Sequence, residues 1–340
     1  MPGEAMGTEG TQIITANTAE VPKRPALGLR REVRGLLRGL WFTAFRLFEK
    51  LGVHVLPANF YTSVQNYQWL KEHKQFWTAR SPLIGINWEI DRQLAWLNEI
   101  CAPYYSEVEG LEFFNETAKQ GWGPGFGRIE SQVLHCFVRS KAPARIVEIG
   151  SGQSTVCMLH ASKLNANEGR GASEVTCIEP YPGEALRRLE GVRLLNQPCQ
   201  SVPASLFSQL RQGDLLFIDS SHAVKVGSDV IRIYMEIIPS LAPGVYVHIH
   251  DINFPYLYNR SILTSFFMQN SQESVLLAAL LSGNARLSVL ASLSALHYDR
   301  SREMRRILKD YEPQDNIEGM WASYPPPGDF PSSIWLETRP

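Results

Sequence analysis

The sequence lacks long apolar runs and an excess of charge of either sign. Its uninterrupted apolar stretches, such as VLLAALL at 275–281, are far short of the ~20 residues that span a bilayer. The first twenty residues hold no apolar segment of the kind found in secretory signals. The formal net charge is −1, from 34 acidic and 33 basic residues, whereas polyanion-binding proteins usually carry a basic excess. We therefore expect no transmembrane segment, no secretory signal and no nucleic-acid partner.

Cysteine is scarce as well. There are five cysteines, an odd number with no CxxC pair, at positions 101, 136, 157, 177 and 199. This pattern fits neither a disulfide framework nor a zinc site, and it favours a cytoplasmic protein. Cys136, Cys157 and Cys177 lie in apolar, periodic segments, so we expect them to pack in the core.

The composition supports a folded protein of about two domains. Hydrophobic residues make up 44% of the chain and charged residues 20%, which is enough for a sizeable core. Residues 1–30 lack periodicity and are expected to form a flexible tail. Short helical patterns broken by prolines fill residues 31–126, and we expect a helical lid or substrate domain there. Residues 127–340 then form the catalytic core.

Residues 31–51 have the spacing of an amphipathic helix. Apolar positions recur every three or four residues, while Arg31, Arg34 and Arg38 fall on the other face. Between residues 21 and 50 there are eight Lys or Arg against two Glu. Two interpretations stay open for this segment: a helix docked by its apolar side with a solvated basic face, or a helix that lies on a membrane surface.

Short apolar runs alternate with helical spans after residue 127. The runs are RIVEIG (145–150), EVTCIEP (174–180), VRLLNQ (192–197), DLLFIDS (214–220) and GVYVHIHD (244–251). Parallel strands need crossover helices, so this alternation predicts an α/β fold with a doubly wound, mostly parallel sheet. In such sheets a ligand lies beyond the carboxyl ends of the strands, which directs attention to the last residues of each run.

The first run ends in a glycine-containing turn, EIGSGQST at 148–155. Gly150 and Gly152 allow a tight turn and a close approach of the backbone to a ligand. A dinucleotide site would require a third glycine where Thr155 stands, and Glu148 is poorly placed for a pyrophosphate. The loop therefore suits a ligand with a cationic amine or sulfonium, although a plain strand-to-helix turn also explains it.

The second run ends in Glu179. A carboxylate at this point can accept hydrogen bonds from both ribose hydroxyls of a nucleoside. Glu179 follows Gly152 by 27 residues, whereas the usual spacing between the glycine loop and the ribose-binding acid is ~20 residues. The polar insertion at 165–173 accounts for the longer spacing. A solvated strand end is the alternative, but the glycine loop beside it favours a nucleoside ligand.

The fourth and fifth runs end in acids and histidines. Asp219 and His222 follow the fourth run, and the imidazole could serve as a general base near neutral pH. The fifth run holds His248 and His250, with Asp251 just past its end, and for His248 a core position is the more plausible interpretation. Asp219, His250 and Asp251 have the ligand types of a divalent metal site.

In this order and spacing, EIGSGQST, CIEPYP, LLFIDSSH and GVYVHIHDI resemble a class I S-adenosylmethionine-dependent methyltransferase. More narrowly they resemble its bacterial small-molecule branch with an IDSSH and HIHDI signature. The similarity extends to HVLPANFYT (54–62), QESVLLAALL (272–281) and SIWLE (333–337). It implies a seven-stranded, Rossmann-like core with S-adenosylmethionine as the cofactor.

The resemblance also implies roles for individual residues. The expected cofactor contacts are Glu148, Gly150, Ser151, Gly152, Glu179, Tyr181, Gln200, Ser201 and Asp219. Among them, the glycines would line the methionine part, Glu179 would hold the ribose, and Gln200 or Ser201 would lie beside the adenine. The expected catalytic residues are His222, Asp219 and His250.

A divalent metal is a further implication. In metal-dependent sugar and antibiotic methyltransferases of similar layout, the aspartate of a DxxH motif binds magnesium and its histidine is the base. The candidate ligands here are Asp219, His250 and Asp251. Those relatives tend to carry an acidic pair after the fifth strand, and a histidine in that pair is a poor ligand for magnesium, which prefers oxygen.

Three functions fit these residues. The first is methyl transfer to an oxygen or nitrogen of a small molecule in specialised metabolism, with His222 taking the acceptor's proton and residues 31–126 closing as a lid. The second is a cyclase or lyase that acts on S-adenosylmethionine itself and releases methylthioadenosine. The third, a non-catalytic binding or membrane-associated module, is disfavoured by the intact residues at all four strand ends. A homodimer is compatible with the resemblance.

Overall fold

The computed structural model describes residues 31–56, 64, 66–122, 125–265, 271–315, 319 and 327–340. The chain divides into two compact units between Thr62 and Ser63. The tail expected at 1–30 and most of the motif at 54–62 lie outside the described residues. A search of the described helices finds no segment with the length and hydropathy of a membrane span.

In the part of the smaller unit that the structure describes there is one helix, α1 (Arg31–Lys50), close to the range 31–51 that the sequence predicted. Its apolar residues recur at helical spacing, and Lys50 in the last turn complements the partial negative charge of the helix C-terminus. Gly52 follows with a positive φ of 74°, which ends the helix in the way that glycine commonly does.

The larger unit holds a sheet of seven strands. The strands are β1 (Arg145–Ile149), β2 (Glu174–Ile178), β3 (Val192–Leu195), β4 (Leu215–Ile218), β5 (Tyr246–His250), β6 (Leu287–Ser292) and β7 (Ser333–Thr338). Their order is β3-β2-β1-β4-β5-β7-β6, with β1 to β5 parallel and β7 antiparallel to both β5 and β6. This arrangement confirms the predicted fold class, a mostly parallel seven-stranded sheet.

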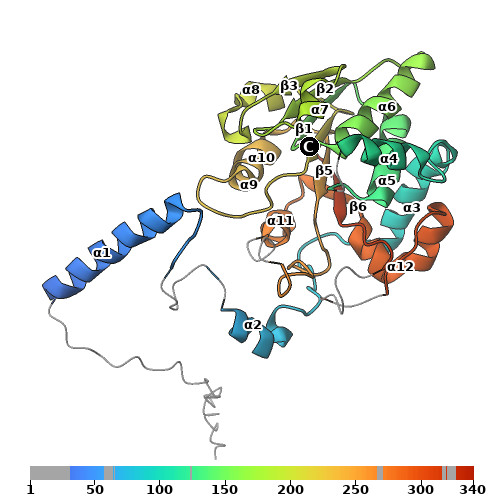
Figure 1. Cartoon of the computed structure of the whole chain (residues 1–340). Helices are drawn as coiled ribbons and strands as arrows, with labels where there is room; N and C mark the ends of the chain where they lie inside the picture. The colour runs from blue at the N-terminus through green and yellow to red at the C-terminus, as the bar shows by residue number, and fades with distance from the viewer. Residues whose placement is uncertain are drawn as a thin grey trace, which may run out of the picture. The chain divides into compact units, whose positions relative to one another are not determined.

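Helices cover both faces of this sheet (Figure 1). The longer ones are α3 (Ile90–Cys101), α5 (Arg128–Lys141), α6 (Gln153–Asn167), α11 (Glu273–Leu281) and α12 (Leu293–Ile307). The shorter α-helices are α2 (Tyr67–Glu72), α4 (Glu112–Thr117), α7 (Glu184–Arg187), α8 (Ala204–Phe207), α9 (Asp229–Arg232) and α10 (Ile238–Ser240). The tighter or wider helical turns are η1 (Lys74–Phe76), η2 (Tyr105–Glu107), η3 (Ala118–Trp122), η4 (Cys199–Ser201) and η5 (Ile233–Ile237).

Two apolar layers hold the helices to the sheet. Alternate strand residues such as Ile146 and Phe217 face α5 and α6, and their neighbours such as Val147 and Leu216 face α9, α10 and α11. This alternation follows from the two-residue period of a strand, and the near-continuous apolar runs follow from burial on both faces.

Part of the region expected to form a lid packs within the larger unit. Leu97, Ile100 and Cys101 of α3 are fully buried in the same apolar layer as α5 and the sheet. The chain divides after residue 62, and the functional boundary expected near residue 126 stays a prediction. The lid function of residues 31–126 stays a proposal. All five cysteines are free and buried, as expected for Cys136, Cys157 and Cys177.

Candidate active site

A cavity of about 390 Å³ opens beyond the carboxyl ends of β1, β2 and β4. A cavity of this size suits a small-molecule ligand. Five of the expected cofactor contacts line it: Gly150, Glu179, Tyr181, Gln200 and Asp219. Residues that the sequence analysis did not single out also line it, among them Cys199, Lys225, Ser228 and Asp229. The fold thus brings three of the expected strand ends to one cavity.

Gly150 allows the ends of β1 and β4 to approach each other. Its φ is +79°, and a Cβ at this position would lie 1.9 Å from the carbonyl oxygen of Asp219. The amide of Asp219 donates a hydrogen bond to the carbonyl of Ile149 over 2.8 Å. Only glycine fits here, because a side chain would clash with backbone that a strand pairing holds in place.

Glu148 lies beneath the glycine turn and is fully buried. Its carboxyl accepts hydrogen bonds from the hydroxyls of Ser154 and Thr155, each over 2.6 Å. Burial raises the pKa of Glu148 to about 7, against the opposing effect of these hydroxyls. Ser151 and Gly152 complete the turn, and the amide of Gly152 donates to Thr155 Oγ1 over 3.1 Å. A carboxyl that titrates near neutral pH therefore lies behind the loop.

The end of β2 places Glu179 in the cavity wall. Its Oε1 accepts a hydrogen bond from the amide of Tyr181 over 2.8 Å, while the Tyr181 side chain is 88% exposed. Gln200, which also lines the cavity, donates a hydrogen bond from Nε2 to the carbonyl of Gly227 over 2.8 Å. Ser201 is exposed at the end of η4 and is not among the residues that line the cavity.

His222 lies among three carboxylates. Its Nδ1 donates a hydrogen bond to Glu273 Oε2 over 2.6 Å, and its Nε2 lies 3.3 Å from Asp219 Oδ1 and 3.6 Å from Asp251 Oδ2. Burial of the ring disfavours its charged form, but the three carboxylates outweigh burial and raise the pKa of His222 well above its ordinary value. The surroundings therefore favour the charged, doubly protonated imidazolium, whereas the sequence suggested a general base that titrates near neutral pH.

Asp251 connects this imidazole to a second one. Its Oδ1 lies 3.7 Å from Nε2 of His250 and accepts a hydrogen bond from Ser332 Oγ over 2.9 Å. The Nδ1 of His250 lies 3.1 Å from Glu130 Oε1. Both His250 and Glu130 are about 5% exposed, so the pair is shielded from water.

We name this arrangement the acid–imidazole row: Glu273, His222, Asp251, His250 and Glu130. Burial opposes charge on His250, yet Glu130, Asp251 and Asp219 raise the pKa of His250 to about 10. Burial likewise opposes charge on Asp251, yet His250 and His222 lower the pKa of that carboxyl. The surrounding groups therefore stabilise the charged forms of His222, Asp251 and His250.

His222 and Asp251 also share an uncommon backbone conformation. Both have a φ of +56°, in the left-handed region, in the turns that follow β4 and β5. Residues other than glycine rarely adopt it, although His and Asp are among those that tolerate it best. Such local strain is frequent at functional sites, where the surrounding fold maintains it.

The expected metal ligands do not converge on one point. Asp219 and Asp251 face Nε2 of His222 from two directions, and Nδ1 of His250 turns to Glu130. Within the part of the chain that the structure describes, no group of three or more His, Cys, Asp or Glu side chains is arranged to hold a metal ion. The residues as placed do not fit a magnesium site, because the His222 imidazole fills the space between the two carboxylates.

Sequence reasoning did not find Glu273 and Glu130. Each is nearly or fully buried on a helix far along the chain from its histidine, at the start of α11 and in the first turn of α5. An acid at the start of an otherwise apolar helical segment was the available signal for Glu273, whereas Glu130 lies beside Arg128, Ser131 and Gln132 and had none. His248 lies in the core as expected, stacked on Phe217 with ring centroids 4.2 Å apart.

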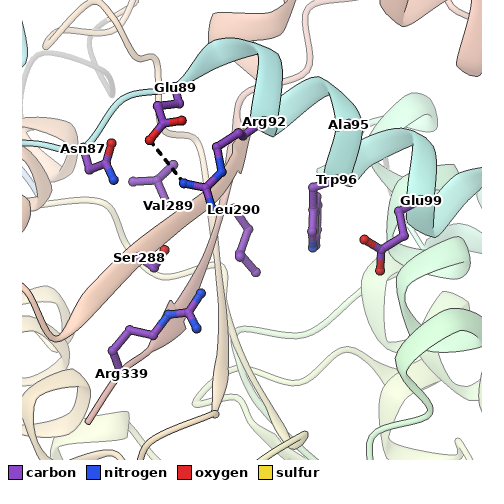
Figure 2. Close-up of a pocket in the computed structure, with 10 residues that line it drawn as sticks. All are labelled: Asn87, Glu89, Arg92, Ala95, Trp96, Glu99, Ser288, Val289, Leu290 and Arg339. Carbon is purple, nitrogen blue, oxygen red and sulfur yellow. Dashed lines mark hydrogen bonds and ion pairs between the residues drawn. The ribbon is translucent and has the colours of Figure 1, made fainter.

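Another hollow, of about 320 Å³, lies between α3 and β6 (Figure 2). Arg92 and Glu89 form an ion pair of 3.2 Å in its wall, and Arg339 lies across from them. Arg339 directly follows β7, whose last residues pair with the start of β5, so this hollow lies at the sheet edge opposite the strand ends. Ligands of such sheets bind at the carboxyl edge, which favours the first cavity as the active site.

Residues 147–252 match a family model described as a methyltransferase domain. The match covers about a third of the chain, and it contains the ends of β1, β2, β4 and β5. An uncharacterized protein of Archaeoglobus fulgidus is 28% identical over 166 residues, which make up 46% of this chain and 73% of that protein.

Similarities to solved structures are weak. A Corynebacterium glutamicum protein has a TM-score of 0.37 at 14% identity, covering 81% of this chain and 97% of that one. The MycE methyltransferase of the mycinamycin pathway has a TM-score of 0.32 at 15% identity, covering 66% and 54%. The mitomycin 7-O-methyltransferase MmcR has a TM-score of 0.34 at 14% identity, covering 61% and 56%. At these values the structural likeness carries no argument about this chain.

Proposed function

We propose that the chain is an S-adenosylmethionine-dependent methyltransferase that acts on an oxygen or nitrogen of a small molecule. The observation that carries the proposal is the coincidence of two findings. The segment that matches a methyltransferase domain contains the strand ends, and five of the residues expected to contact the cofactor line one cavity there. A cytoplasmic location, a role in specialised metabolism and a homodimer remain predictions.

The chemistry of the cavity suits S-adenosylmethionine. Glu179 and Asp219 line it, and Glu148 lies behind the glycine turn, so acidic groups face a ligand that carries an ammonium and a sulfonium. Glu179 would accept the ribose hydroxyls, and Gln200 would lie beside the adenine. Gly150 and Gly152 would lie against the methionine part.

Methyl transfer requires an acceptor held in line with the methyl group and a place for its proton. S-adenosylmethionine supplies the methyl carbon: the acceptor's lone pair bonds to it while the carbon–sulfur bond breaks and its electron pair stays on sulfur. Asp219 lines the cavity and also lies 3.3 Å from Nε2 of His222. We therefore assign the acceptor's proton to the group formed by Asp219, His222 and Asp251, rather than to a neutral His222 alone.

The segment before α5 approaches the glycine turn and supports a covering role. The carbonyl of Trp122 lies 3.7 Å from the position of a Cβ at Gly152. Gln153 Nε2 donates a hydrogen bond to Thr117 Oγ1 on α4. Residues 112–122 would thus close over the methionine end and exclude water from the reaction.

The direct test is incubation of the full chain with S-adenosylmethionine, with and without a fractionated small-molecule extract, followed by mass spectrometry. S-adenosylhomocysteine that forms only with an acceptor fraction is the expected product. The Asp219→Asn variant should lose turnover, and Glu236→Gln, at a side chain that is 70% exposed, should retain it. Methylthioadenosine formed without an acceptor would contradict the proposal and support the cyclase alternative.

A further inference from the structure

Helix α1 carries an apolar surface that its own unit does not cover. Its exposed large apolar side chains are Val33, Leu36, Leu37, Leu40, Trp41, Phe42, Leu47 and Phe48. No side chain of α1 among those described is buried. Contiguous apolar surface of this kind marks a binding surface for a protein or a membrane.

The apolar residues are concentrated on one side of the helix. At about 100° per residue, seven of the eight exposed apolar positions fall within an arc of roughly 140°, and Phe42 lies outside it. Arg38 and Arg46 fall on the opposite side, with Lys50 at its border. With 20 residues the helix is long enough to span a bilayer, but its hydropathy is too low. It could therefore contact a membrane only with its axis parallel to the surface.

The positive charge of residues 21–50 favours one class of partner for this surface. Residues 21–50 contain eight Lys or Arg and two Glu, a net charge of +6, and the whole chain has a net charge of −1. The other residues therefore sum to −7, so the positive charge is concentrated in the helix and the residues before it. Trp, Phe and Leu on one face with Arg and Lys on the other are typical of helices that lie at the surface of an anionic membrane.

We propose that α1 binds the surface of a bilayer that contains anionic lipids, with Leu36, Leu40 and Leu47 in the acyl boundary. Arg38 and Arg46 then face the headgroups. A nucleic acid would satisfy the basic residues but would leave the leucines in water. A second copy packed through the leucines would leave the basic face solvated, so it would account for only one of the two faces of the helix. The inference does not depend on the proposed reaction, because it concerns a different unit of the chain.

Vesicle co-sedimentation of the full chain tests the proposal. Vesicles of phosphatidylcholine and phosphatidylglycerol, mixed about 3:1, should bind at least about tenfold more tightly than pure phosphatidylcholine vesicles. Binding should weaken at about 0.5 M salt, where charge interactions are screened. The Leu40→Glu/Leu47→Glu double variant should lose binding. The matched control Ile84→Glu/Val226→Glu, at positions that are 79% and 104% exposed in the larger unit, should keep it.

Trp41 supplies a second readout, since its side chain is 46% exposed on the apolar side of α1. Its emission should shift to shorter wavelength on addition of the anionic vesicles, and Trp41→Phe should remove most of that shift. Absence of vesicle binding would overturn the proposal, as would equal binding by the Leu40→Glu/Leu47→Glu variant. A two-chain mass that this variant halves, without vesicle binding, would instead assign the surface to a second copy.

Discussion

Glu273 accepts a hydrogen bond from Nδ1 of His222 over 2.6 Å, although the two residues are 51 positions apart in the sequence. Glu273 is fully buried at the first position of α11, where the helix N-terminus favours a negative charge. The bond fixes the orientation of the ring, so that its Nε2 faces Asp219 and Asp251. Glu273 does not line the cavity, so it acts through His222 rather than on a ligand.

Replacement of Glu273 tests this relationship. The Glu273→Gln variant should lower the pKa of His222, because one of the carboxylates that raise it is removed. Turnover should fall by about 10- to 100-fold, while the affinity for S-adenosylmethionine should change little. NMR titration of the imidazole, a turnover assay and calorimetric binding measure these three quantities. Unchanged titration of His222 would show that Glu273 has no influence on the ring.

Replacement of Gly150 tests how much of the loss in unfolding free energy comes from a steric clash and how much from the positive φ. In Gly150→Ala, the added Cβ would lie 1.9 Å from a backbone oxygen at a φ of +79°. The free energy of unfolding should fall by about 3 kcal/mol or more. Gly171→Ala is the matched control, because its φ is +85° but nothing lies within 4 Å of the Cβ, so its cost should be about 1 kcal/mol. Urea unfolding measures the free energy of unfolding of both variants. Equal losses in Gly150→Ala and Gly171→Ala would refute the steric argument.

Stability should fall as the pH falls from about 6.5 to about 4. Burial lowers the pKa of His135 and of His297 to about 4, from an ordinary value of 6.5. The unfolded chain then binds these protons more tightly than the folded chain, so stability is present above pH 6.5 and is lost below it. Urea unfolding at several pH values should show a net loss of a few kcal/mol, because the raised pKa of Glu148 stabilises the fold at low pH and offsets only part of the loss from the two histidines.

A His297→Gln variant should show a smaller loss over the same pH range. The matched control His54→Gln, at a side chain that is 63% exposed, should follow the wild type. A wild-type stability that is flat between pH 6.5 and 4 would contradict the assignment.

Affinity for S-adenosylmethionine should rise with pH around neutrality. The pKa of Glu148 is raised to about 7, so its carboxyl gains a negative charge behind the glycine turn as the pH passes that value. A cationic ligand binds better to the ionised form. Calorimetry between pH 6 and 8 should show this trend, about severalfold in Kd, and Glu148→Gln should abolish it. A pH-independent wild-type affinity would remove Glu148 from the binding interaction.

The sequence predicted the parallel half of the sheet well. The runs that became β1 to β5 are short, apolar and bounded by turns, because strands buried on both faces need no polar alternation. Strand β6 (Leu287–Ser292) was not predicted. It mixes serines with apolar residues and contains a bulge between Val289 and Ala291. Its sequence therefore shows neither the two-residue period of a strand nor the 3.6-residue period of a helix.

The candidate site was predictable where it depends on the ends of strands. Glu179, Asp219 and Gly150 follow from the rule that ligands bind at the carboxyl edge of a parallel sheet. Glu273 and Glu130 were not predictable, because helices bring them to His222 and His250 from distant parts of the chain. The raised pKa of His222 depends on Glu273 and Asp251 as well as on Asp219 of its own motif, so that motif alone could not predict it.

All five cysteines are free and buried, so chemical modification of their thiols can report local unfolding of the chain. Burial raises the pKa of the Cys199 thiol to about 12 and those of Cys157 and Cys177 further, so these thiols stay protonated and react slowly. An alkylating reagent should therefore modify Cys101, Cys136, Cys157 and Cys177 only when their surroundings unfold locally, whereas Cys199 lines the cavity and is the reference for a reagent that enters it. Because these four thiols lie in α3, α5, α6 and β2, the order in which they are modified would map which parts of the core unfold first.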